Sequence, residues 1–307
     1  MADISRDDLA TIIQEEYSNE LLAAALSGSA ALRLFRTVNL GTKTTNLPVL
    51  ATIPEAEFVG ESATQDVGKK PTSQATWGNK QLVAEEIAVI IPIHENAIDD
   101  ATTATLDEIT ALGGAAIGRK LDGAVFFGTN KPAAWTSDDL FAAAVAANQT
   151  VTVGDVADGD DLGGCIYQAA QMVDEAGWDP SGLAAPRGLR FRLPNIRTST
   201  GEPIWLPGTN GTLDNVAGLD TGFVPGRVWD RNDAEGIVFD RERVIIGVRQ
   251  DITVKFLTEA TVGGINLAER DMVALRFKAR YAYVLGTGVN DEGDAQVPVA
   301  AVLPSGS

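Results

Sequence analysis

The stretch from Gln81 to Gly128 constrains the fold most, because it reads as an apolar strand followed by one long, uninterrupted helix. Between Gln81 and Ile93, apolar residues recur at every second position, which is typical of a strand with one buried face. The residues on this face are Val83, Ile87, Val89, Ile91 and Ile93. The pattern predicts a half-buried strand packed on the protein core.

The helix is predicted to span residues 102–127. Its apolar residues recur at steps of three to five, as a core-facing stripe requires. The stripe consists of Leu106, Ile109, Leu112, Ala116, Leu121 and Val125. Thr105 and Glu108 have the spacing of a capping box, and Gly128 is the expected stop. At a rise of about 1.5 Å per residue the helix is roughly 35–40 Å long, so it would serve as a spine.

This predicted helix contains four glycines, which are Gly113, Gly114, Gly118 and Gly123. Each costs about 1 kcal/mol relative to alanine in a helix interior. Two explanations are open at this point. Another part of the protein packs closely against the helix, or the helix is slightly bent and tolerates its glycines.

Composition excludes several classes of protein. The 307 residues are enough for a sizeable core, in one large domain or two intertwined ones. The chain has 24 basic and 42 acidic residues, a net charge of −18, which argues against duplex nucleic acid as a direct partner. The single cysteine, Cys165, excludes an intrachain disulfide and fits a reducing cytoplasm. We find no signal peptide and no apolar run of about 18 residues, so neither secretion nor membrane spanning is expected.

The segments that precede the strand look like an arm and a loop. Residues 5–26 are predicted to form an amphipathic helix with Leu9, Ile12, Ile13 and Tyr17 on one face. This arm either reaches toward a neighbour or docks on its own core. Residues 47–81 comprise two strand-like limbs around a polar tip, and such a long excursion with few apolar anchors is uncommon inside a compact domain. We interpret it as a binding or assembly loop.

The segments after the helix favour an α+β arrangement. A second helix is predicted from Leu162 to Gly177, and short strands at 237–239, 244–248 and 252–257. The longest strand is predicted at Met272–Leu285, with apolar side chains on one face and Arg276, Lys278 and Arg280 on the other. We interpret the basic row as solvated or paired with acids, and a phosphate contact is the alternative.

Catalytic and metal-binding signals are weak. His94 is the only histidine, so a histidine-rich zinc site is excluded and any nucleophilic triad would have to use this residue. We interpret it as a structural histidine. The acidic cluster lacks the spacing of an EF-hand loop and is interpreted as a solvated turn; it consists of Asp155, Asp158, Asp160 and Asp161. No catalytic residue, cofactor or metal is predicted.

The order of arm, long hairpin, spine helix, α+β middle and long final strand resembles the major capsid proteins of tailed bacteriophages with the HK-ninety-seven-type fold. The segments that carry the resemblance are residues 46–50, 58–61, 84–96, 117–122 with 127–128, and 276–281. The resemblance covers nearly the whole chain. It implies an N-terminal arm at 1–46, an extended loop at 47–93, a peripheral domain at 94–150 and 240–285, and an axial domain at 151–239 and 286–307.

The resemblance implies a structural subunit and no enzyme. Copies would assemble into hexamers and pentamers of an icosahedral head that encloses double-stranded DNA without sequence-specific binding. The protein would be assembled in the host cytoplasm and end in the virion, with scaffold, portal and decoration proteins as possible partners. Two alternatives are an encapsulin-like compartment that encloses an enzyme, and an acid-dependent hydrolase with two carboxylates in one pocket.

Contacts between subunits are expected at the loop, the arm and the basic row. The predicted contact residues are Phe58, Glu61, Lys69, Lys70, Trp77, Leu9, Ile13, Arg276 and Arg280. Trp77 packing inside its own subunit is the alternative. Some members of the family join a loop lysine to an asparagine of the next subunit with the aid of a buried glutamate. Lys69, Lys70 and Lys80 lie in the loop and Asn266 near the far strand, but a complete triad cannot be matched residue by residue. The spine glycines are expected to let the helix bend or pack closely as subunits adapt to shell curvature.

Overall fold

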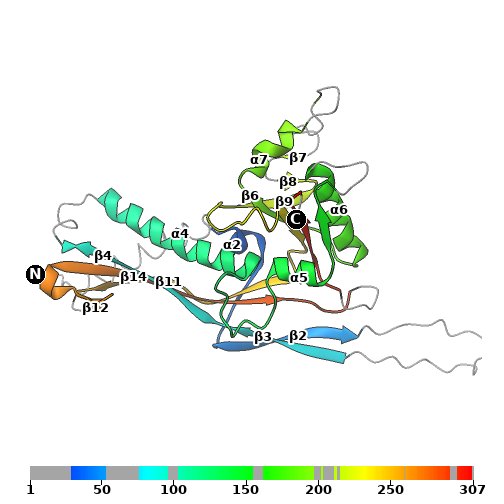
Figure 1. Ribbon diagram of the computed structural model, residues 1–307. Coiled ribbons are helices and arrows are strands. Elements are labelled where there is room, and N and C mark those ends of the chain that lie inside the picture. Colours follow the sequence, from blue (N-terminus) through cyan, green and yellow to red (C-terminus); the bar gives the residue numbers. More distant parts are fainter. Residues whose placement is uncertain are drawn as a thin grey trace, which may run out of the picture.

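The structure is a computed structural model that describes residues 29–52, 76–95, 103–154, 162–196, 202, 211–212, 215–258, 260–290 and 296–305. Its strands form a four-stranded sheet in the order β1-β11-β14-β4, a seven-stranded sheet in the order β5-β15-β10-β6-β9-β8-β7, and the pairs β2-β3 and β12-β13. Helices pack against the sheets (Figure 1), so the fold is α+β as predicted.

The helices have the following bounds: α2 (Ala30–Leu34), α4 (Thr103–Phe127), α5 (Leu140–Ala146), α6 (Leu162–Glu175), α7 (Leu189–Arg192), η1 (Leu193–Asn195) and η2 (Ala268–Arg270). The strands are β1 (Arg36–Asn39), β2 (Thr44–Thr52), β3 (Thr76–Val83), β4 (Glu85–His94), β5 (Thr150–Thr152), β6 (Gly182–Pro186), β7 (Gly211–Thr212), β8 (Asn215–Val216), β9 (Leu219–Val224), β10 (Gly236–Phe239), β11 (Val244–Leu257), β12 (Thr261–Val262), β13 (Ile265–Asn266), β14 (Met272–Leu285) and β15 (Val299–Leu303).

The spine helix α4 lies along one face of the four-stranded sheet (Figure 1). Leu121 and Val125 are fully buried, as the predicted stripe requires, but Leu112 is 56% exposed, so the prediction was wrong there. The reason lies next to it: a Cβ on Gly113 would come within 2.9 Å of the Phe277 ring. The helix therefore meets the sheet through Gly113, and Leu112, about 100° further round the helix, turns away from the core.

The strand predicted from Gln81 to Ile93 is divided at Ala84 into β3 and β4. Strand β3 pairs with β2, whereas β4 pairs with β14 in the main sheet. The backbone N–H of buried Ala84 donates to the Lys43 carbonyl at 2.8 Å, which closes the hairpin at this point. The core-facing side chains of β4 lie where the alternation predicted them. The β2–β3 pairing therefore ends at Thr44 and Val83, and β4 belongs to the main sheet.

Strand β14 has the predicted bounds and the predicted faces. Its apolar side chains contact the main core, while Lys278 on the opposite face pairs with Glu86, Nζ to Oε2 2.6 Å. Strand β11 is continuous, although two strands were predicted. The register between β11 and β14 shifts between Val248 and Gln250 and again before Thr253, so bulges stand where the sequence suggested a gap.

Residues 29–40 belong to the body, although the sequence predicted an arm over 1–46. Strand β1 runs parallel to β11. Leu34 fills space over Gly222, where a Cβ would lie 2.2 Å from Leu34 Cδ1, and Leu40 similarly covers Gly247 at 2.6 Å. Both glycines are needed because leucine side chains occupy the positions of their missing Cβ atoms. The predicted arm residues at 1–28 lie outside the described part of the chain.

The seven-stranded sheet is covered by α6, whose buried residues Leu162, Ile166, Ala169 and Val173 were predicted. Gly177 adopts a φ of +78° just after this helix, as expected of its stop. An aromatic cluster joins this sheet to the spine: ring centroids lie 4.9 Å apart for Phe35 and Phe239 and 5.6 Å apart for Phe35 and Phe126. No helix in the described segments is both long and apolar enough to cross a membrane.

Candidate intersubunit surfaces

The β2–β3 hairpin extends from one side of the body (Figure 1). Its pairing runs from Thr44 opposite Val83 to Thr52 opposite Thr76. Trp77, near the outer end of the described hairpin, is 67% exposed. An isolated two-stranded hairpin is at best marginally stable in water. The exposed ring and the two-stranded pairing therefore leave a surface that a partner could cover.

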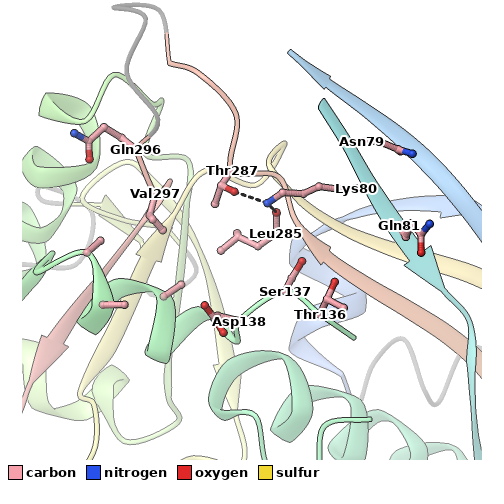
Figure 2. A pocket seen from close by; sticks show the side chains of 13 residues that line it. Asn79, Lys80, Gln81, Thr136, Ser137, Asp138, Leu285, Thr287, Gln296 and Val297 are labelled. Atoms are coloured by element: carbon pink, nitrogen blue, oxygen red, sulfur yellow. Dashed lines mark hydrogen bonds between the residues drawn. The ribbon is translucent and has the colours of Figure 1, made fainter. Parts of the chain in front are cut away.

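Lys80 fixes the root of this hairpin to the body (Figure 2). Its Nζ donates to the Leu285 carbonyl at 2.7 Å and to the Thr287 hydroxyl. These residues line a cavity of about 690 Å³ that also contains Asp138. Burial lowers the pKa of Lys80, and the Asp138 carboxylate opposes that effect. The lysine considered from sequence for a crosslink thus contacts its own subunit.

The turn after the spine helix contacts the same root. Trp135 Nε1 donates to the Val83 carbonyl at 3.0 Å, and the Tyr283 hydroxyl donates to the Asp138 carbonyl at 2.9 Å. Burial raises the pKa of Tyr283 well above its ordinary value. The hairpin is therefore held at its base by side-chain bonds from two sides, and only its outer part projects.

The face of the four-stranded sheet opposite α4 is open and basic. Arg276 lies opposite Ile90 on one neighbouring strand and Lys255 on the other. Ile90 is 39% exposed. Like charges directly opposite each other in a sheet are destabilising unless an acid is near. The structure places Arg276 and Arg280 on this face together, as predicted, and whether they contact a neighbour stays a prediction.

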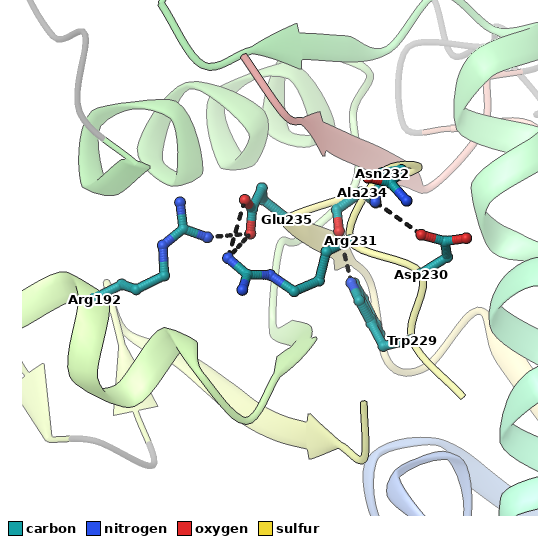
Figure 3. Close-up of polar contacts among 7 residues, drawn as sticks. All are labelled: Arg192, Trp229, Asp230, Arg231, Asn232, Ala234 and Glu235. Atoms are coloured by element: carbon teal, nitrogen blue, oxygen red, sulfur yellow. Dashed lines mark hydrogen bonds and ion pairs between the residues drawn. The ribbon is translucent and has the colours of Figure 1, made fainter. Parts of the chain in front are cut away.

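A second charged cluster joins α7 to the loop before β10 (Figure 3). Glu235 is 6% exposed and accepts from Arg192 and, at 3.4 Å, from Arg231. Trp229 Nε1 donates to the Ala234 carbonyl at 2.6 Å within the same loop. Sequence reasoning missed this cluster, although the spacing of four between Arg231 and Glu235 was a usable signal.

Phe191 is the most exposed of the large hydrophobic residues that the structure describes, at 79%. It lies on α7 between Arg190 and Arg192. The sequence did not single it out, because one aromatic residue in a short helix has no periodic pattern. The exposed ring makes the surface around α7 a further candidate contact surface.

Asp122 is a buried carboxylate on the core side of the spine helix. It accepts from the Ser29 hydroxyl at 2.6 Å and from the backbone N–H groups of Ala30 and Ala31 at 3.0 Å each. Burial raises the pKa of Asp122 to about 6, and these three donors oppose that effect. The residue caps the N-terminus of α2 and ties it to the spine. An acid between buried Leu121 and Val125 was the signal that sequence reasoning passed over.

Another cavity, of about 640 Å³, is lined by the carboxylates of Asp179, Asp240 and Glu242. Burial raises the pKa of Asp240, and a bond from the Glu242 N–H opposes it. Asp240 pairs with Arg243 at 3.9 Å and Glu242 with Arg36 at 3.8 Å. Because these two acids have arginine partners, we interpret the arrangement as a brace for the turn between β10 and β11.

Several predicted residues lie outside the described part of the chain. They are Phe58, Glu61, Lys69, Lys70, Leu9, Ile13 and the acidic cluster at 155–161. His94 is the last residue of β4, lies opposite Met272 and is exposed. Among the described residues, no group of three or more histidine, cysteine, aspartate or glutamate side chains is arranged to hold a metal ion.

Comparisons with known proteins agree with this architecture. The chain matches the phage capsid family over residues 10–286. A solved structure from Mycobacterium phage Bobi is 56% identical, with a TM-score of 0.81 and 100% of each chain covered. One from Mycobacterium phage Cain is 52% identical, with a TM-score of 0.82 and 100% of each chain covered. A capsid of a native GTA particle computed with C5 symmetry is 12% identical over 90% of each chain, with a TM-score of 0.62, and shares the fold alone. No curated protein matches the chain.

Proposed function

Because the chain belongs to the phage capsid family and is a major capsid protein of a virion, we propose that its β2–β3 hairpin lies over a neighbouring copy and joins subunits into hexamers and pentamers. These capsomers form an icosahedral head that encloses double-stranded DNA. The observation that carries the proposal is the 67% exposed Trp77 on a hairpin whose base alone is held by the body.

The energetics favour a neighbour as the partner of Trp77. Large aromatic side chains bury roughly 150–250 Å² each, and each Å² is worth about 25 cal/mol. Covering the exposed part of this ring is therefore worth about 2–4 kcal/mol, the range of a binding hot spot. Phe58, Glu61, Lys69 and Lys70 belong to the same excursion, and we propose that they contact the neighbour too.

Charge supplies a second reason. The open sheet face carries Arg276, Arg280 and Lys255. The loop segment 53–75 has four acids and two lysines, and the segment 1–28, which contains Leu9 and Ile13, has six acids and one arginine. Acidic segments of one copy would meet a basic face of the next, which fixes the register of docking.

The same reading covers the remaining partners. A solved structure described as the capsid of a native GTA particle shares the fold. We propose that assembly takes place in the host cytoplasm, with portal, scaffold and decoration proteins as further partners. The family is structural, and we propose that this chain catalyses no reaction.

The proposal is tested by Trp77→Ala, with Leu112→Ala as the matched control, because Leu112 is 56% exposed on the spine helix. We expect Trp77→Ala to raise the concentration needed for assembly about 30-fold or more, which corresponds to a loss of about 2 kcal/mol per contact. Sedimentation and negative-stain electron microscopy measure both. Shells that form equally well with Trp77→Ala would refute the role of the hairpin, and a wild-type chain that stays monomeric would refute assembly itself.

The contents of the particle separate a phage head from an encapsulin-like compartment. Nuclease-resistant double-stranded DNA in purified particles is the expected result. A co-purifying enzyme in place of DNA would indicate a compartment.

A further inference from the structure

We propose that a basic pocket beside the spine helix, formed by Arg119, Lys120 and Arg227, holds phosphate groups of the packaged DNA backbone. The inference rests on the proposed function, in which the shell encloses DNA. It adds a binding site to a chain whose overall charge of −18 gives no hint of one.

The pocket lies between α4 and the turn that precedes β10. Its volume is about 440 Å³, and it is lined by Arg119, Lys120, Gly123, Thr129, Gly226, Arg227, Val228, Trp229 and Asp230. The buried neighbours Ile117 and Leu121 place Arg119 and Lys120 on the side of α4 that faces away from the core. Gly123, without a side chain, leaves the pocket floor open between them and the turn.

The charged groups of the pocket are free to bind an anion. Within the described residues, no ion pair involves Arg119, Lys120 or Arg227. The one acid in the lining is Asp230, whose Oδ1 accepts from the Asn232 N–H at 2.9 Å (Figure 3). The lining therefore has a local excess of positive charge.

Other cations nearby differ in this respect. Arg192 and Arg231 share the buried carboxylate of Glu235. The acids elsewhere on the chain do not cancel the pocket, because charges separated by more than about 8 Å are largely screened at physiological ionic strength. A phosphate that enters the pocket meets three cationic side chains of the lining and one acid, Asp230.

The chemistry suits a phosphodiester backbone and gives no reading of sequence. Duplex DNA presents one charge per about 1.7 Å of helix axis, so neighbouring phosphates can reach Arg119 and Arg227 together. The Thr129 hydroxyl is a neutral donor in the same lining. The proposal requires that the exposed side of α4 faces the interior of the head, where the DNA lies, and that the sheet face opposite α4 faces outward. The acidic remainder keeps binding weak.

The test measures the salt dependence of binding between the full-length unassembled chain and a fluorescent 20-base-pair duplex. Each phosphate contact contributes a slope of about −0.9 in log K against log salt. We expect the double variant Arg119→Gln/Arg227→Gln to lose about 1.8 from that slope. Taking the electrostatic contribution as zero near 1 M salt, binding falls about 60-fold at 0.1 M.

The matched control is Arg249→Gln/Arg270→Gln, which removes the same charge from two exposed arginines elsewhere on the chain. An equal loss in both variants would show a general charge effect and overturn the pocket. Wild-type protein that does not bind the duplex even at 20 mM salt would overturn it as well. Inorganic phosphate is the further probe. If inorganic phosphate stabilises the wild-type protein but not the double variant, while DNA binds both proteins equally, the site holds a free ion and the DNA assignment is wrong.

Electron microscopy of the same proteins under assembly conditions separates the two ideas. If wild type and variant both form shells and their DNA binding has equal salt slopes, the pocket is refuted and the capsid function is left intact. A wild-type chain that forms no shells would refute the capsid function whatever the slope.

Discussion

Gly113→Ala should destabilise the subunit, although alanine is the better helix former. The substitution gains up to about 1 kcal/mol of helix propensity. Its Cβ, however, would lie 2.9–3.0 Å from three carbons of the Phe277 ring, whereas carbon atoms pack best at about 3.5–4.0 Å. Phe277 is fully buried, so any shift of its ring must displace neighbouring core side chains. Overpacking of this kind costs about 1–3 kcal/mol, so we expect a net loss of about 1–2 kcal/mol.

Gly123→Ala is the matched control on the same helix. Its Cβ would meet Val228 Cγ1 at 3.6 Å and Thr129 Cβ at 3.7 Å, both ordinary contacts. No steric cost then opposes the gain in helix propensity, and stability should rise by about 0.5–1 kcal/mol. The two alanine variants should therefore differ by about 1.5–3 kcal/mol in their free energies of unfolding, with opposite signs relative to wild type.

Urea unfolding of the unassembled subunit, followed by far-ultraviolet circular dichroism, measures both. With a slope of about 1–3 kcal/mol/M, the midpoints should lie about 1 M apart. Adding Phe277→Leu to Gly113→Ala should recover part of the loss, because the ring atoms in contact are gone. If Gly113→Ala is as stable as wild type, the helix does not depend on this close approach and the reasoning fails.

Three further predictions concern buried charged groups. Burial raises the pKa of Asp122 to about 6 from 3.8. Between about pH 4 and 6 the folded chain therefore keeps a proton that the unfolded chain has lost, and stability falls as pH rises through that window. Asp122→Asn should remove this fall in the free energy of unfolding measured by urea at each pH. Lys80→Met should speed limited proteolysis of the hairpin about tenfold through loss of about 1–1.5 kcal/mol at its root, while the more exposed Lys43→Met should not. Glu235→Gln should cost about 1–3 kcal/mol because Glu235 is buried between arginines, whereas Asp220→Asn, at an exposed pair, should cost under about 1 kcal/mol; a reversed order in thermal unfolding would contradict this.

Strict periodicity explains which elements the sequence could predict. Strand β14, helix α6 and the C-terminal half of α4 each bury one continuous face, so alternation or a 3.6-residue repeat located them. No glycine or proline marks the break between β3 and β4 at Ala84. The feature at the break is a backbone hydrogen bond from Ala84 to the Lys43 carbonyl, about 40 residues earlier in the chain. Nothing local could show it.

The remaining errors come from partners distant in sequence. Leu34 packs over Gly222 and Leu40 over Gly247, and these contacts convert a predicted arm into part of the body. The surface residue Trp77 could be predicted, because an aromatic residue beside a polar loop is conspicuous. The anchor at Lys80 could not, since its acceptor is a backbone carbonyl that any residue at position 285 would supply.

The spine glycines finally separate the two explanations that the sequence left open. At Gly113 the sheet approaches so closely that the helix cannot slide or bend there without moving a buried ring. Such a contact makes the spine a rigid support at this point, so close packing is the explanation that holds at Gly113. Subunits in hexamers and pentamers must still differ in their angles to one another. We expect the β2–β3 hairpin to be the part that adjusts, because it is bonded to the body at its root by Lys80 and Trp135 while Trp77 further out is exposed.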